Sequence, residues 1–89
     1  MSEALTEAEA IERGLREQIS DLVRARARAD GEGRRLSTRA TLAGAHRDLA
    51  DLAGRYERQS KTLAAEIETL RSSLRAAEAE VERLRAPDG

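Results

Sequence analysis

A seven-residue repeat of apolar side chains runs along the C-terminal half of this sequence and constrains the fold more than any other feature. Such spacing keeps one face of a helix against a partner helix, and its period predicts left-handed supercoiling. We therefore predict a long helix that packs along another helix. The members of the repeat are Leu42, Leu49, Tyr56, Leu63, Leu70, Ala77 and Leu84.

The composition favours long helices over a compact globule. The chain has 89 residues, with one Tyr and no Phe or Trp, so large aromatic side chains are almost absent from any core. Charged residues make up 37% of the chain, yet the formal net charge is only -1. Many charges with low hydrophobicity also allow disorder, but the near-zero net charge and the regular leucine spacing argue against it. The fold class predicted is all-α.

A first amphipathic helix is predicted over residues 7–29, after a tail at residues 1–6. Thr6 and Glu9 have the spacing of a capping box, in which each side chain bonds a backbone amide of the first turn. The apolar stripe that follows alternates steps of three and four residues, as one helix face requires. This stripe consists of Ala8, Ile11, Leu15, Gln18, Leu22, Ala25 and Ala29, widened by Ile19.

The segment "DGEG", residues 30–33, predicts the end of that helix. Gly31 and Gly33 can adopt left-handed backbone conformations, and glycine is unfavourable inside a helix. We predict a turn at residues 30–34 and a second helix from residue 35, capped by Ser37 or Thr38 and ended by Pro87, with a tail at 87–89. A connection this short predicts antiparallel neighbours, that is, a helical hairpin.

The second apolar position of each heptad changes its spacing near residue 60. Ala45, Leu52 and Gln59 lie three residues after the first position, whereas Ile67, Leu74 and Val81 lie four after it. This change predicts different partners before and after it. We predict a hairpin over 7–60 whose core comprises Ile11, Leu15, Leu22, Leu42, Leu49, Leu52 and Tyr56.

Residues 61–86 are predicted to extend beyond the hairpin as a coiled-coil zipper. β-Branched residues at one core position with leucine at the other favour parallel two-stranded coils, so a parallel dimer with another copy is expected. A higher oligomer, or a bundle in which both helices join one long coil, remains an alternative, as does a different partner chain. The predicted oligomer interface is Leu63, Ile67, Leu70, Leu74, Ala77, Val81 and Leu84.

Arginines cluster around the predicted turn. Residues 22–39 carry net +4, whereas residues 1–21 carry net -4. A basic hairpin tip could contact phosphates, but the chain lacks the aromatic residues on which single-stranded bases usually stack. We expect an acidic protein surface before a nucleic acid as the partner. The candidate contacts are Arg24, Arg26, Arg28, Arg34, Arg35 and Arg39.

The sequence offers little for catalysis or for cofactor binding. There is no cysteine, and His46 is the only histidine and hence the only candidate general base. No histidine pair or phosphate-binding glycine motif occurs. We predict no catalytic residue, no metal, no cofactor and no enzymatic activity.

The function expected from these patterns is coiled-coil oligomerisation and assembly, as a scaffold or adaptor that presents surfaces to proteins. A larger complex such as a secretion machine or phage assembly would suit this class only by analogy. Two alternatives stay open: a nucleic-acid accessory protein that uses the arginines, and an inhibitor or regulator that binds a partner. The absence of an export signal or a long apolar run predicts a cytoplasmic protein without membrane contact.

Overall fold

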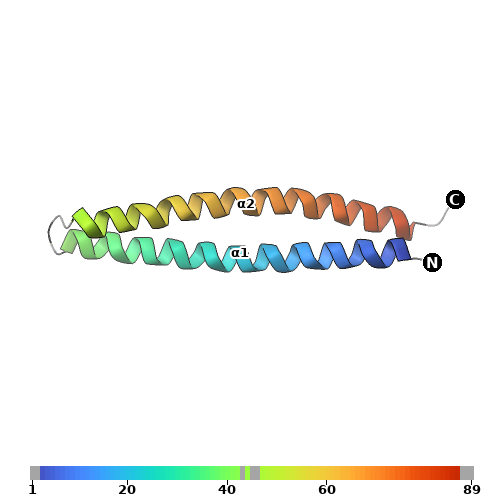
Figure 1. The fold of residues 1–89 in the computed structure, drawn as a ribbon, viewed down its shortest axis with the longest axis horizontal. Coiled ribbons are helices and arrows are strands. Elements are labelled where there is room, and N and C mark those ends of the chain that lie inside the picture. The colour runs from blue at the N-terminus through green and yellow to red at the C-terminus, as the bar shows by residue number, and fades with distance from the viewer. Residues whose placement is uncertain (1–2, 43, 45–46, 87–89) are drawn as a thin grey trace.

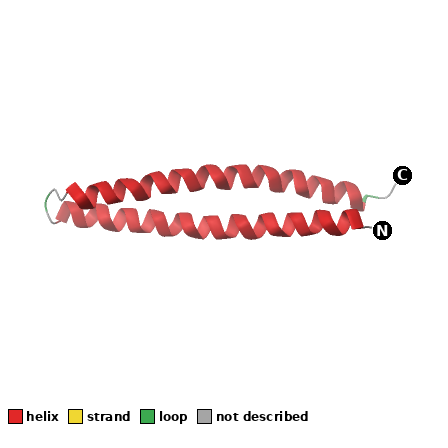
Figure 2. Cartoon of the chain, viewed as in Figure 1, coloured by secondary structure: helices red, strands yellow, loops and turns green. Residues whose placement is uncertain are grey.

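Two long antiparallel helices make up the fold (Figure 1). The computed structural model describes residues 3–42, 44 and 47–86. Helix α1 spans Glu3–Leu42 and helix α2 spans Arg47–Arg85, and the described residues include no strand (Figure 2). The molecule is a rod of 69 × 14 × 13 Å. The predicted all-α helical hairpin is confirmed, although its bend lies elsewhere along the chain.

The chain reverses direction near Gly44. This residue has a φ of 76°, the only positive φ among the described residues, and its N–H donates to the Thr41 carbonyl at 3.3 Å. A glycine in the left-handed region just past a helix end is a common way to terminate a helix. The turn predicted at residues 30–34 is therefore wrong, and so is the predicted start of the second helix at residue 35.

Helix α1 continues through "DGEG", where Gly33 faces α2. Gly31 and Gly33 both lie within the helix. A Cβ added to Gly33 would lie 3.4 Å from the Cβ of Tyr56, so the two backbones approach closely. Leu36 and Ala40 continue the same stripe and are buried. The packing of this stripe outweighs the low intrinsic helix propensity of the two glycines.

The termini of the helices also differ from the prediction. Helix α1 begins at Glu3, so residues 3–6 are helical rather than part of a tail, and Thr6 is not the capping residue. Leu5 is half-buried and adds a heptad position before Ala8, which gives these residues a reason to be helical. Residues 1–2, Pro87 and the rest of the predicted tail 87–89 lie outside the described residues.

The apolar stripe of α2 keeps one phase along the whole helix. Its second core position is filled by Ala53 and Ser60, both buried, in place of the predicted Leu52 and Gln59, which are exposed. Ala45, the remaining member of that prediction, lies outside the described residues. The predicted change of phase is therefore wrong. The core positions hold the small residues Ala53 and Ser60, whereas the prediction assigned them to their larger neighbours Leu52 and Gln59.

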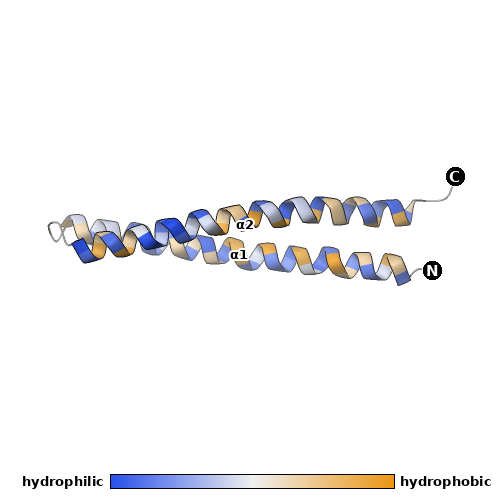
Figure 3. Cartoon of the chain, turned by 45° about the horizontal axis from the view of Figure 1, so that its top comes forward, coloured by the Kyte–Doolittle hydropathy of each residue, from blue (hydrophilic) through white to orange (hydrophobic). Residues whose placement is uncertain are grey.

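The C-terminal half of α2 lies against the N-terminal half of α1. Because the helices are antiparallel, equal steps of 11 and 25 residues along both from the Gly33 and Tyr56 contact place Leu22 level with Ile67 and Ala8 level with Val81. Ile67 and Val81 are only 3% and 2% exposed. Residues 61–86 are therefore not an extension beyond the hairpin, because the longer α1 gives them a partner inside the chain. Hydrophobic residues recur along both helices among strongly hydrophilic ones (Figure 3).

Candidate functional site

One side of the hairpin, here called the charged flank, is bridged by ion pairs between the helices. Arg16 of α1 donates to Glu78 of α2 at 3.0 Å, and Arg85 of α2 pairs with Glu9 of α1. Bonding to Glu9 raises the pKa of Arg85. These pairs lie beside the core stripe, where facing residues of two antiparallel helices meet. Because all four side chains are partly exposed, these ion pairs contribute little to the stability of the hairpin. Their main effect is to determine which residues of the two helices face each other.

The opposite side, here called the open flank, carries mostly uncharged residues. Its positions beside the core include Ile11, Gln18 and Ala25 on α1 and Leu52 and Gln59 on α2. Ile11 is 60% exposed and Leu52 is 37% exposed. Among residues 3–42, 44 and 47–86, no ion pair joins the two helices on this flank. The two long faces of the rod therefore differ in chemistry.

Two shallow grooves lie on the open flank. The first lies along α1 and is lined by Ile11, Gly14 and Leu15, among others, and a Cβ added to Gly14 would meet nothing within 4 Å. The second, of about 650 Å³, lies between the helices. Its lining combines small and aromatic side chains with charged residues at the rim. The residues are Ala25, Arg28, Ala29, Gly31, Glu32, Arg35, Tyr56 and Gln59.

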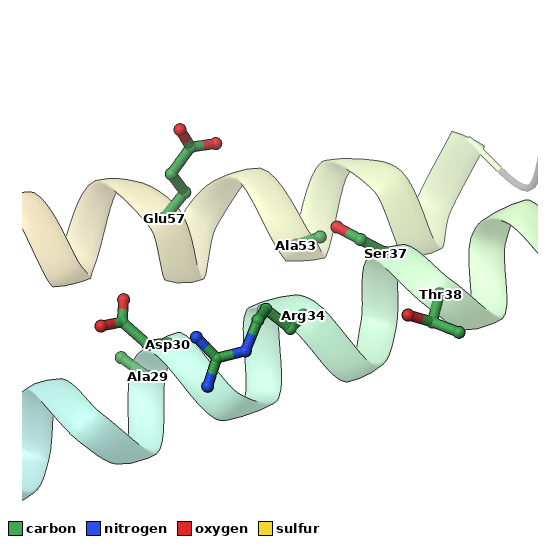
Figure 4. Close-up of a pocket in the computed structure, with 8 residues that line it drawn as sticks. Ala29, Asp30, Arg34, Ser37, Thr38, Ala53 and Glu57 are labelled. Atoms are coloured by element: carbon green, nitrogen blue, oxygen red, sulfur yellow. The ribbon is translucent and has the colours of Figure 1, made fainter.

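A third groove, of about 400 Å³, lies on the charged flank nearer the turn (Figure 4). Small core residues, Ala29, Gly33 and Ala53, form its floor. Asp30 and Arg34 of α1 lie beside one another at its edge, whereas Glu57 points away from α1 (Figure 4). None of the polar lining residues is buried. The groove follows from thin packing and lacks the buried polar groups of a specific small-molecule site.

Two polar side chains of α1 occupy core positions of the stripe. The side chain of Glu12 is 14% exposed and pairs with Arg16 one turn later. The Nε of Arg26 lies 3.5 Å from the Oγ of buried Ser60 and 4.0 Å from a carboxylate oxygen of Asp30. Polar groups at core positions cost stability but restrict the alignment of paired helices.

The arginines proposed as a basic tip lie along the second half of α1 instead. Three of them pair with acids one turn away: Arg24 with Asp21, Arg26 with Asp30, and Arg35 with Glu32. The hydrogen bond from Arg35 lowers the pKa of Glu32 and raises that of Arg35. Arg28 lines the open-flank groove, Arg34 lines the groove of Figure 4, and Arg39 lies in the last turn of α1.

The predicted hairpin core is correct only in part. Leu15, Leu22, Leu49 and Tyr56 are half-buried, but Ile11, Leu42 and Leu52 are exposed, Leu42 by 82%. Leu42 is the last residue of α1, whereas the predicted heptad repeat counts it together with residues of α2. The repeat of α2 does not continue across the turn, so Leu42 does not lie on the buried stripe. Sequence reasoning missed Gly33, Leu36, Ala53 and Ser60, although their spacing of three and four residues could have revealed them.

The predicted interface residues all lie on the stripe that faces α1. Ile67 and Val81 are buried there, whereas the other members remain half-exposed: Leu63, Leu70, Leu74, Ala77 and Leu84. The sequence argument that these residues need a second chain therefore no longer holds. Their contact with another copy stays a prediction.

Little in the described residues provides reactive chemistry. They include no group of three or more potential metal ligands, and none of their helices has the length and apolarity needed to cross a membrane. His46, the only candidate general base, lies outside the described residues. No family model, curated protein or solved structure matches this chain.

Proposed function

We propose that this protein is a non-enzymatic assembly protein, a coiled-coil hairpin that oligomerises and presents its faces to protein partners as a scaffold or adaptor. The supporting observation is its large exposed surface. The chain exposes 6561 Å², whereas a compact monomer of this mass, 9.8 kDa, exposes about 5200 Å². The difference, about 1400 Å², exceeds what one partner contributes to a standard interface, about 800 Å².

The thin core of the hairpin supports the same proposal. Four of its seven buried apolar residues are alanines, and no large side chain among the described residues is fully buried. In the part of the chain that the structure describes, the other three buried apolar residues are Leu36, Ile67 and Val81. Since a large aliphatic side chain contributes roughly 1.5–3 kcal/mol when fully buried and alanine much less, the hairpin gains from further burial. Assembly with another protein supplies that burial. We expect this assembly to act in the cytoplasm.

Native co-purification after chemical cross-linking tests this function. The tagged chain should be recovered in a complex heavier than 9.8 kDa, containing further copies or a defined partner. The control is Ile67→Asp, which places a charge in the buried stripe and should abolish the complex together with the hairpin. Recovery of the unmodified chain alone, at its native abundance, would contradict the proposal.

A further inference from the structure

We propose that two copies of this chain pack antiparallel through their open flanks, with Ile11 of each copy seated in the groove between the helices of the other. This inference rests on the proposed assembly function and specifies its partner, surface and orientation. Three observations carry it: the distribution of charge along the rod, the positions of Ile11 and the groove, and the absence, among the described residues, of ion pairs that join the two helices on this flank.

The rod has oppositely charged halves. The half that contains the start of α1 and the end of α2, residues 3–21 and 68–86, has six basic and ten acidic residues, a formal charge of -4. The half that contains the turn, residues 22–67, has ten basic and six acidic residues, a charge of +4. Antiparallel copies place unlike halves side by side, whereas parallel copies place like halves together. Such complementarity selects orientation and speeds association.

The most exposed apolar side chain of the open flank and the groove lie on either side of the rod's midpoint at similar distances. Ile11 lies about ten residues, or ~15 Å, from the change of charge sign at a helical rise of 1.5 Å per residue. Tyr56 and Gln59, which line the groove with Ala25 and Ala29, lie ~13–17 Å from it on the other side. A twofold axis at the midpoint therefore brings Ile11 of one copy level with the groove of its partner, twice over.

The open flank is the face available for this contact. On the charged flank, Arg16 and Arg85 are engaged with acids of the facing helix, and separating or covering these pairs would cost their hydration. On the open flank Ile11 is 60% exposed beside neutral residues such as Gln18. The ion pair on the rim of the groove, Arg35 with Glu32, lies within α1 and does not bridge the helices. The surface in excess of a compact monomer is sufficient for a standard interface.

Cross-linking between single-cysteine variants tests the orientation, because the chain has no cysteine of its own. Equal amounts of the Ile11→Cys and Gln59→Cys proteins, mixed and treated with a short bis-maleimide, should form the mixed dimer. Ile11→Cys alone should not, since its two copies lie about 30 Å apart in the antiparallel dimer. Within one chain the two positions are about 28 Å apart, too far for the reagent. Two outcomes would overturn the inference: a cross-linked dimer from the Ile11→Cys protein alone, or no cross-linked dimer from the mixture.

Sedimentation equilibrium tests the surface. The unmodified chain should have twice the 9.8 kDa monomer mass, and its dissociation constant should rise with salt as the opposed charges are screened. Ile11→Lys should raise that constant at least about tenfold, because the twofold axis places the change in the interface twice. The matched control is Val23→Lys, since Val23 is 41% exposed on the charged flank, and it should leave the constant unchanged. Equal effects of the two variants would refute the assigned face.

These outcomes separate the inference from the function on which it rests. A parallel dimer, or a purified chain that stays monomeric while the native protein is found bound to a different protein, overturns the antiparallel inference and leaves the assembly function standing. A chain that is monomeric in both settings overturns both.

Discussion

Replacing Gly31 by alanine tests the continuity of α1 at the place where the sequence suggested a bend. Gly31 lies inside the helix, its φ is not positive, and an added Cβ would meet nothing within 4 Å. Alanine should therefore recover the helix propensity that glycine loses, about 1 kcal/mol. For a domain of this size, such a gain raises the Tm by about 4–8 °C.

The same change at Gly44 should have the opposite sign. Gly44 has a φ of 76°, and a residue with a Cβ in the left-handed region costs roughly 1–2 kcal/mol. Thermal unfolding followed by circular dichroism, at one fixed protein concentration because assembly shifts the Tm, compares both variants with the unmodified chain. If Gly31→Ala lowers the Tm as Gly44→Ala does, the helix is not continuous at residue 31 and the packing argument fails.

Two further predictions follow from burial and from the exposed acids. Ile67→Ala should lower the free energy of unfolding by roughly 2 kcal/mol, the low end for a buried isoleucine, because the narrow core is open to solvent at its sides. Leu42→Ala, at a site that is 82% exposed, should change that free energy little. Equal effects of the two variants in urea unfolding would contradict the assigned core. Arginine partners lower the pKa of Glu32 and of Glu80, so their stabilisation is present above the ordinary value of 4.5 and is lost as pH falls through the lowered pKa values. The double variant Glu32→Gln/Glu80→Gln should flatten that part of the stability profile against pH, and an unchanged profile would show that these pairs contribute nothing measurable.

The heptad repeat determined the class of fold because it depends only on residue spacing. The positions Leu49, Tyr56, Leu63 and Leu70 all lie on the face of α2 that meets α1, and the low aromatic content excluded a compact globule in favour of a rod. An antiparallel hairpin followed from glycine in a short connection. The existence of two helices could therefore be predicted from the sequence.

The position of the bend could be decided only by tertiary packing. The sequence alone does not distinguish Gly31 and Gly33, which lie inside a helix, from Gly44, which lies at the turn. Local propensity predicts a turn at the two glycines of "DGEG". In the folded chain, Gly33 approaches Tyr56 within a shared stripe, and the whole length of α2 is covered only if α1 extends to Leu42. Burial along the full rod outweighs the cost of two helical glycines. That balance places the turn near Gly44 and packs the expected zipper, residues 61–86, against α1.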